Sequence, residues 1–283
     1  MSWQAQLVLA YRLGAPQGEG MVARTDAIHT HTGPLRILRS LYPEGAGICH
    51  NVLVHPPGGV VGGDALQVNV SGAPGTHGLI TTPGATRFYA SDGPLATQRV
   101  QIDLHADARL EWLPLETICH SGTRAENHLA MRLAPGAQVM GWDITALGLP
   151  HANQPFELGQ FRQHIELEGH WLERALIQAC DTRLLNSPAG LAGQRCMATL
   201  YIASGSPLTR SKRQTLLDAA RSLMQTSDLR SHAGATSPGD RIVVARALAP
   251  VSEPVTALLR QIRLAWRREL WNLSGASPRI WST

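Results

Sequence analysis

The sequence predicts a mainly β fold, a large layered β-sheet body with a few helices, most of them in the C-terminal third. Three observations support this prediction. Period-two patterns of apolar residues recur through residues 1–205. Charged residues make up only 16% of the chain, while 27 glycines and 18 prolines supply turns, which is unlike a helical bundle. A helical period appears only after this β-rich part.

Apolar alternation places the expected strands. Residues 3–11 (WQAQLVLAY) put Ala5, Leu7 and Leu9 on one face, and residues 66–70 (LQVNV) follow the same pattern. Turn sequences such as SGAPGTHG and LAPGAQ separate the runs, so they indicate a large antiparallel or layered β structure. Further strands are expected at 48–54, 77–82, 98–104, 109–114, 128–133, 138–147, 161–168, 171–178 and 197–203.

Two helices are expected in the last third of the chain. Apolar residues recur at helical spacing over 211–225, and a strand follows at 241–248. A second apolar stripe runs from Glu253 to Leu273. Pro254 lies in the first turn of that helix, where its missing N–H is harmless, and Ser252 is the expected N-cap.

The chain is predicted to be one domain, residues 1–283, with a β-rich part at 1–205 and a mixed helix and strand part at 206–283. No linker or internal repeat separates two units. The net charge is +4, but no run of Lys and Arg marks a nucleic-acid patch, so nucleic-acid binding is not expected. No signal peptide or membrane-spanning length is apparent either, so we expect a cytoplasmic protein without membrane association.

The four cysteines predict neither a disulfide framework nor a closed metal site, because no Cys-x-x-Cys pair occurs. Two cysteines precede a histidine, but adjacent strand residues point to opposite faces, so neither dipeptide chelates a metal by itself. His29 and His31 alternate on one strand face, which supplies only two ligands. No permanently bound cofactor is expected, and transient contact with nickel or zinc stays open. The residues for which such contact is undecided are Cys49, Cys119, His29, His31 and His120.

The segment HPPGGVVGGD, residues 55–64, is rich in glycine but does not fit a phosphate-binding loop. A P-loop needs Lys and Ser or Thr after its last glycine, whereas Asp64 follows Gly63 and would repel phosphate. The segment also precedes a strand instead of opening a helix. It is therefore interpreted as a sharp double turn that Asp64 caps. The turn residues of this corner and of a second one (TTPGATRFYAS, 81–91) are His55, Pro56, Pro57, Gly58, Gly59, Gly62, Gly63, Pro83 and Gly84.

Carboxylates are scattered along the chain. Glu173 is the most informative, because it lies within an apolar strand pattern, where a charge is costly unless it is paired or contacts water. Two such acids could serve general acid–base catalysis, but the sequence alone does not bring them together. Ser91 has neither a Gly-x-Ser-x-Gly elbow nor a nearby histidine, so a hydrogen-bonded turn is favoured over a nucleophile there.

Six segments, in chain order, resemble the UreD family of urease accessory proteins, called UreH in some bacteria. They are HPPGGVVGGD, TTPGATRFYAS, the LEWLPLET run, WDITALGLP, LERALI and the closing PRIWST. The resemblance extends from about Trp3 to the last residue and implies a β-helix-like body with a few helices and no catalysis of its own. Ala90 departs from the arginine usual in the second segment, and Cys119 and His120 match no family motif.

The resemblance also implies partners. Members bind UreF, which recruits the GTPase UreG, and the assembly, expected to be dimeric, docks on the urease apoprotein. Nickel is then thought to pass along a water-filled tunnel within UreD to the dinickel site. Asp64 and Glu173 are similar to acids proposed to line that path. For Asp64, turn-capping and a role in nickel passage are therefore equally supported interpretations. The candidate nickel-path residues are Asp64, Ser91, Glu116, Asp143 and Glu173.

The C-terminal helix region is expected to support the UreF interface. Arg260, Arg263 and Arg267 lie off the apolar stripe and are predicted to form a solvated basic face, with a docking surface as the second interpretation. Together with Trp281 they are the candidate partner interface. Two other functions stay open: a stand-alone hydrolase using Asp64, Glu116 and Glu173, and a β-rich chaperone for a different metalloenzyme.

Overall fold

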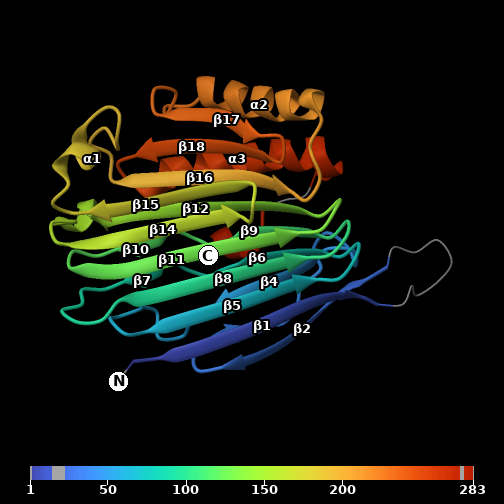
Figure 1. Cartoon of the computed structure of the whole chain (residues 1–283), viewed down its shortest axis with the longest axis horizontal. Helices are drawn as coiled ribbons and strands as arrows, with labels where there is room; N and C mark the ends of the chain where they lie inside the picture. Colours follow the sequence, from blue (N-terminus) through green and yellow to red (C-terminus); the bar gives the residue numbers. More distant parts are fainter. Residues whose placement is uncertain (1, 15–22, 275–276, 283) are drawn as a thin grey trace.

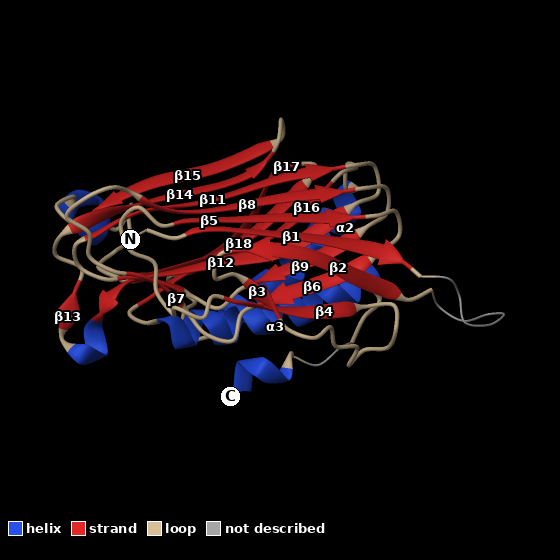
Figure 2. Ribbon diagram, turned by 90° about the horizontal axis from the view of Figure 1, so that it is seen from below, coloured by secondary structure: helices blue, strands red, loops and turns tan. Residues whose placement is uncertain are grey.

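The computed structural model describes residues 2–14, 23–274 and 277–282; within the closing motif PRIWST, Thr283 lies outside the described residues. Two β-sheets face each other, and helices cover the outer face of the second sheet (Figures 1 and 2). The seven-stranded sheet contains, in spatial order, β15 (Trp171–Gln178), β14 (Gly159–Leu167), β11 (Thr123–Leu133), β8 (Ala96–Leu104), β5 (Ala65–Gly72), β1 (Gln4–Leu13) and β2 (Thr25–Thr32).

The second sheet has eleven strands. Its main path is β17 (Ala233–Gly239), β18 (Ile242–Ala249), β16 (Cys196–Ser204), β12 (Gln138–Leu149), β9 (Arg109–Leu113), β6 (His77–Thr81), β4 (Cys49–Val54) and β3 (Arg36–Ile37). The short strands β10 (Thr117–Cys119) and β13 (Gln154–Pro155) pair with β12, and β7 (Thr86–Phe88) pairs with β10.

The middle of both sheets is parallel. Strands β1, β5, β8, β11 and β14 run in one direction in the first sheet, and β4, β6, β9 and β12 are parallel in the second. The chain crosses from one sheet to the other after almost every strand, which is the path of a β-helix, and antiparallel strands close the ends. The mainly β, β-helix-like fold is therefore confirmed.

The two ends of this coil differ. At one end, short turns such as 73–76, 105–108 and 134–137 join consecutive strands. At the other end the connections are longer and include the Pro/Gly corner at 55–64 and the second corner within 82–95. The two corners rich in proline and glycine therefore lie at the same end of the body.

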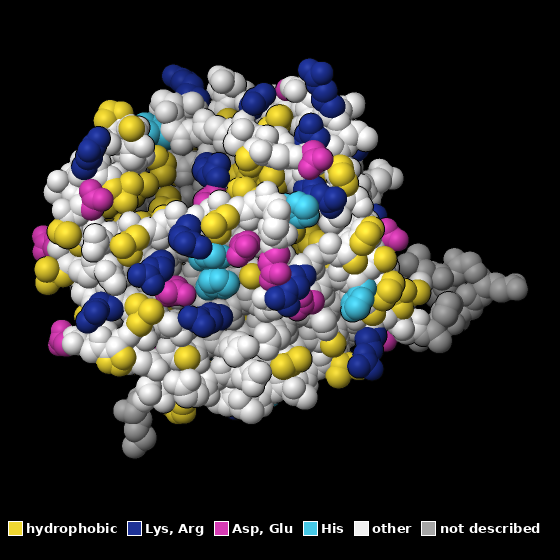
Figure 3. Space-filling model, in the orientation of Figure 1, with side chains coloured by type: hydrophobic (Ala, Val, Ile, Leu, Met, Phe, Trp, Pro, Cys, Tyr) yellow, Lys and Arg dark blue, Asp and Glu magenta, His cyan; other side chains and the backbone are white. Residues whose placement is uncertain are grey.

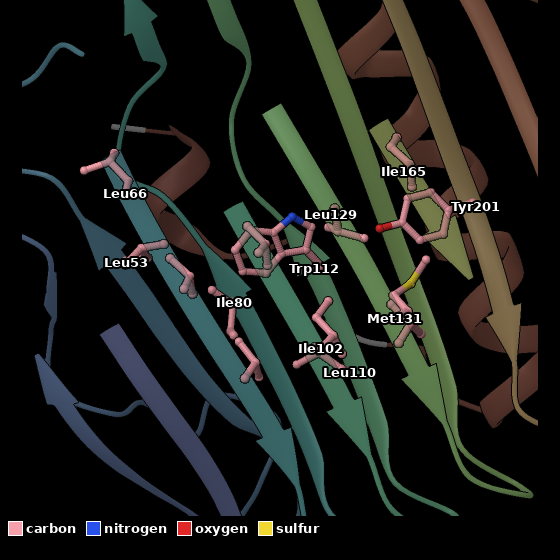
Figure 4. Close-up of a cluster of buried hydrophobic side chains, with 14 of the residues drawn as sticks. Leu53, Leu66, Ile80, Ile102, Leu110, Trp112, Leu129, Met131, Ile165 and Tyr201 are labelled. Atoms are coloured by element: carbon pink, nitrogen blue, oxygen red, sulfur yellow. The ribbon is translucent and has the colours of Figure 1, made fainter. Parts of the chain in front are cut away.

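The structure has two apolar cores, one between the two sheets and one between the eleven-stranded sheet and the helices. Figure 4 shows Leu66, Ile102 and Leu129 of one sheet pointing toward Trp112 and Tyr201 of the other. The second core lies between the eleven-stranded sheet and two helices, α2 (Arg210–Gln225) and α3 (Ser252–Trp271). Smaller elements are α1 (Thr182–Asn186), η1 (Pro150–Ala152) and η2 (Arg279–Ser282).

Both expected helices are confirmed, but the expected cap of the second is wrong. Ser252 is the first residue of α3, and the capping position belongs to Val251, which makes no side-chain capping hydrogen bond. Pro254 does lie in the first turn. The short helix α1 was not predicted because one turn of helix has no readable period; Asp181 caps it by accepting a hydrogen bond from the Leu184 N–H.

Candidate functional site

A row of polar side chains replaces apolar residues in the layer between the sheets. Gln98 of β8, Asn127 of β11 and Gln163 of β14 lie directly opposite one another on neighbouring parallel strands. Their strand neighbours on the same face, such as Val100 and Leu129, are buried core residues, so the three amides also point inward. Gln98 Nε2 donates to Asn127 Oδ1 at 3.2 Å, which links the row.

Asp143 of β12 meets this row from the opposite sheet. Its carboxylate accepts hydrogen bonds from Asn127 Nδ2 at 3.1 Å and from Thr145 Oγ1 at 2.9 Å. Among the described residues it has no cationic partner. Burial raises the pKa of Asp143 to about 6, and the nearby Glu173 charge adds to this, against hydrogen bonds that lower it. Asp143 is half-buried, and a carboxylate in such a place that is supported only by neutral groups is costly, so its presence here calls for a functional explanation.

Two further buried polar groups beside Asp143 lack hydrogen bonds. The Gln163 amide lies close enough to lower the pKa of Asp143, yet neither of its polar side-chain atoms has a partner of ordinary hydrogen-bond geometry. The Tyr201 hydroxyl is likewise buried and unpartnered in the described part of the chain. Such atoms are rare in folded proteins and are available to a transient ligand.

The polar path continues to the edge of the layer through Thr199 and Glu173. Thr199 of β16 lies opposite Asp143 in the sheet, and its hydroxyl donates to Glu173 Oε1 at 3.0 Å. Glu173 also forms an ion pair with Arg246 of β18, whose Nε lies 3.1 Å from Glu173 Oε2. Glu173 is thus both ion-paired and partly exposed to solvent, which are the conditions that a charge within an apolar strand requires.

Two adjoining cavities lie between Asp143 and the surface. An outer cavity of about 260 Å³ is lined by residues of both Pro/Gly corners, including His55, Gly58 and Pro83. A small inner cavity of about 20 Å³ lies against Asp143 and Asn127, enough for one water-sized group. The residues common to both cavities are Thr86, Gln98, Val100, Trp112 and Pro114. We call these cavities, together with the polar path to Glu173, the interior passage.

His55 stands at the outer cavity with an available ring nitrogen. Its Nε2 atom is buried and has no hydrogen-bond partner among the described residues. Burial lowers the pKa of His55, against a smaller effect of Asp64 that raises it, so the imidazole is neutral at neutral pH. A neutral imidazole nitrogen is a preferred ligand of nickel and zinc.

Asp64 lies at the base of the first corner, outside the lining of either cavity. One of its carboxylate oxygens accepts a hydrogen bond from the Trp3 N–H at 2.6 Å and the other from the Val61 N–H at 3.0 Å. The carboxylate is fully engaged in holding backbone, and the side chain is buried. Of the two interpretations left open for Asp64, the structure therefore supports turn-capping.

The glycines of this corner serve close packing. Gly63 has a φ of 88°, a conformation that favours glycine. A Cβ atom at Gly59 would overlap the Tyr89 ring, and one at Gly62 would overlap the Ser91 hydroxyl. The two corners are thus packed directly against each other, which shapes the mouth of the outer cavity.

The other candidate acids do not converge on the passage. Ser91 is half-buried and its hydroxyl bonds within its own turn, with the Pro94 carbonyl and the Gly93 N–H. Glu116 lines a separate open pocket of about 350 Å³ beside Glu253. The structure brings Asp143 and Glu173 together and leaves Asp64, Ser91 and Glu116 apart, so the three acids of the hydrolase alternative share no pocket.

A second group of buried charges was missed by sequence reasoning. Glu111 of β9 faces the helices and binds Arg263 of α3, with its Oε2 at 2.8 Å from Nε and 2.5 Å from Nη2. Arg267 lies 3.1 Å from the other oxygen of Glu111 and also pairs with Glu44 at 2.8 Å. Burial alone would raise the pKa of Glu111, but Arg263, His77 and Arg267 outweigh it and lower the pKa to about 2.

The prediction of a solvated basic face is therefore wrong for Arg263 and Arg267, whose side chains are fully buried. Trp281 is buried too: its indole N–H donates to Thr81 Oγ1 at 2.7 Å, and Arg260 stacks on its ring at 4.8 Å. Arg263, Arg267 and Trp281 anchor α3 and the C-terminal turn to the sheet and offer no free partner surface, whereas Arg260 is only half-buried. The signal in the sequence was Glu111, a charge inside an apolar strand that needed a buried counter-charge.

The cysteines and histidines considered for metal contact do not form a closed site. Cys49 and Cys119 are buried, and burial raises the pKa of both thiols. His29 and His31 do share a face of β2, with ring centroids 6.3 Å apart. In the described residues no three His, Cys, Asp or Glu side chains are grouped so that they could hold a metal ion. Nor does any helix in the ranges 2–14, 23–274 and 277–282 have the length and apolar character to cross a membrane.

Comparison with known proteins matches nearly the whole chain. Residues 5–282 match the family described as UreD urease accessory protein. The proteins named urease accessory protein UreD from Variovorax paradoxus (strain S110) and Polaromonas sp. (strain JS666 / ATCC BAA-500) are 59% and 58% identical, covering 100% of both chains. That of Albidiferax ferrireducens is 56% identical with the same coverage. The chain belongs to the UreD urease accessory protein family.

Proposed function

We propose that this chain is a non-enzymatic scaffold for urease maturation that passes nickel through its interior to the urease apoprotein. In this proposal it binds UreF, and through UreF the GTPase UreG, in a dimeric cytoplasmic assembly. Membership of the UreD family and the names of its relatives support the role in maturation. Nickel is the cargo of the chain and not its resident cofactor.

The observation that carries the nickel route is the uncompensated Asp143 carboxylate at the inner end of the passage. A divalent cation loses hydration when it enters a protein, so it needs oxygen or nitrogen groups to replace water. Asp143 supplies charge, and the Asn127 and Gln163 amides and the Tyr201 hydroxyl supply neutral donors. One carboxylate and weak neutral ligands favour transit over tight capture.

The order of groups along the passage gives the cation a stepwise route. His55 offers a neutral imidazole at the outer cavity, and Gln98 lines both cavities. Asp143 follows, and Thr199 and Glu173 lead to the edge between the sheets. Arg246 neutralises Glu173, so a cation reaching that end must displace the guanidinium or leave before it.

Catalysis is the weaker alternative because, among the described residues of the interior passage, no nucleophile is joined to a base. Asp143 bonds only the Asn127 amide and the Thr145 hydroxyl, and Glu173 is held by Arg246 and Thr199. The remaining alternative is a chaperone for another metalloenzyme. It involves the same residues of this chain and differs only in the enzyme that receives the metal.

The test is co-expression with UreF, UreG and apo-urease, followed by pull-down and a nickel-dependent urease assay. We expect the chain to retain all three partners and urease activity to depend on its presence. If urease is fully activated in the absence of this chain, with some other protein retaining the partners, the proposal is overturned. Capture of a different apo-metalloenzyme in place of urease would support the chaperone alternative.

A further inference from the structure

The outer face of the seven-stranded sheet carries a row of side chains that the interior passage does not use. Arg99 of β8, His128 of β11, His164 of β14 and Arg174 of β15 lie directly opposite one another on four neighbouring strands. We call them the outer row. They line one open depression of about 440 Å³. Figure 3 looks onto this face, where basic, acidic and histidine side chains gather near the centre.

The outer row is electrostatically unfavourable in the free protein. Like charges directly opposite on neighbouring strands destabilise a sheet. The His128 and His164 rings stack with centroids 4.1 Å apart and planes 19° from parallel, so positive charges on both rings repel each other. Burial, His164 and Arg99 lower the pKa of His128 in that order, against smaller effects of Glu126 and Glu166 that raise it. The fold gains nothing from placing these four side chains side by side.

Nearby acids do not balance the row. Glu126 is the one carboxylate lining the depression, and it is shared by Arg99 at 3.5 Å and Arg162 at 3.4 Å. Glu166 lies two residues after His164 on the same face of β14 and pairs with it at 2.9 Å. Arg174 makes no ion pair or hydrogen bond with any described residue. The depression therefore holds more guanidinium charge than carboxylate charge even when both histidines are neutral.

We propose that the outer row binds a small multivalent oxyanion of the phosphate class. A guanidinium presents a planar fork of N–H donors that matches phosphate oxygens, and an imidazolium adds a further donor. Neighbouring strands are about 4.8 Å apart, so an anion with two phosphate groups can contact more than one position of the row. The bound anion would offset the repulsion among Arg99, His128, His164 and Arg174. Arg99, His128 and Arg174 line neither cavity of the interior passage, whereas His164 also borders the inner cavity.

The charge on the two histidines sets the pH dependence. An anion favours protonated imidazole, so binding takes up protons and its affinity rises as pH falls from 8 to 6. The groups that face the rings are Arg99 and Gln101 of β8, Glu126 of β11, Arg162 and Glu166 of β14, and Arg174 of β15.

The experiment is isothermal titration of the full-length chain with pyrophosphate at pH 6.5 and pH 8.0, at one ionic strength. We expect saturable binding that is tighter at pH 6.5, with Arg174→Gln weakening it about tenfold, the effect of one charge-assisted hydrogen bond. His128→Gln should remove much of the pH dependence. Both residues are on the sheet surface, so both variants are expected to fold.

Arg124→Gln is the matched control, because Arg124 is an exposed arginine on β11, on the same face but outside the depression. Its affinity for pyrophosphate should equal that of the unsubstituted chain. An equal loss in Arg124→Gln and Arg174→Gln would show general attraction to a basic protein and overturn the site. Absence of saturable binding by the unsubstituted chain at pH 6.5 would overturn it as well.

Discussion

Three carboxylates in this chain have three different environments. Asp64 and Glu111 are buried: Asp64 accepts two backbone N–H groups, and Glu111 binds two guanidiniums. Asp143 is half-buried and accepts hydrogen bonds from the Asn127 amide and the Thr145 hydroxyl. The first therefore holds a turn, the second fixes a helix, and the third has no cationic partner among the described residues.

Asp64→Asn is expected to destabilise the chain although an amide usually replaces a capping carboxylate well. Both oxygens of Asp64 accept an N–H, so the amide nitrogen would have to face a donor and leave it unsatisfied. We expect a loss of about 1–3 kcal/mol in the free energy of unfolding. Urea denaturation measures it, with the exposed Asp103→Asn as control. Equal stability of both variants would contradict the assigned cap.

Asp143→Asn is expected to shift the pH dependence of stability. The pKa of Asp143 is raised to about 6 in the folded chain from its ordinary value of 3.8, so ionisation favours the unfolded state. The variant should gain stability relative to the unsubstituted chain as pH rises from 4 to 6. Above pH 6 the difference should stay level, at no more than about 3 kcal/mol. Thermal denaturation across pH 4–8 tests this, and a difference that does not change with pH would contradict the assignment.

At the scale of elements, α3 shows what an apolar stripe reveals and what it omits. Its bounds and its apolar face followed from the spacing of residues such as Leu259 and Trp266. Its arginines were assigned to solvent because a helix pattern alone does not identify the surface on the other side. Glu111 is 152 residues away from Arg263, and only the packing of α3 on the sheet brings them together.

Arg263→Met is expected to destabilise the chain more than Arg260→Met. Loss of Arg263 leaves Glu111 and Glu44 with one buried guanidinium between them, which we expect to cost about 3 kcal/mol or more. Arg260 instead stacks on Trp281 at the surface of the same helix. Chemical denaturation compares the two variants, and an equal cost would contradict a buried network at Glu111.

Removal of residues 253–283 would take away α3 together with its core contacts. Val255, Leu258 and Trp266 are buried against the sheet, so the truncated chain would expose that core. Loss of UreF binding in this truncation would follow from unfolding as readily as from a lost interface. Point substitutions on exposed residues are needed to map the interface.

For the whole molecule, the sequence predicted the β-rich body and the order of most strands, but not the passage. Apolar alternation assigns a residue to a face without specifying whether neighbouring strands are parallel. Gln98, Asn127 and Gln163 become neighbours only through the parallel register of β8, β11 and β14. In the sequence they are three unremarkable polar residues about thirty positions apart, and no local pattern links them to Asp143.

The β-helix path also explains how two sites can use the same strands. Asn127 points between the sheets toward Asp143, while its neighbour His128 points outward into the outer row. A substitution in the outer row should therefore leave the passage intact. We expect Arg174→Gln to support full nickel loading of urease, measured by metal analysis of the purified enzyme. Reduced loading at normal complex yield would contradict the separation of the two sites.

The most direct test of the account is the nickel content of urease matured with Asp143→Leu, alone and combined with Glu173→Leu. Leucine removes the charge and a ligand without leaving an unpaired buried charge, so the fold and the complex with UreF, UreG and urease should persist. We expect normal pull-down of all partners, with nickel per urease and urease activity both reduced on the order of tenfold. The exposed Asp103→Leu should give full loading. Full nickel content with the double variant would contradict the passage, and loss of the complex itself would show that these carboxylates are structural.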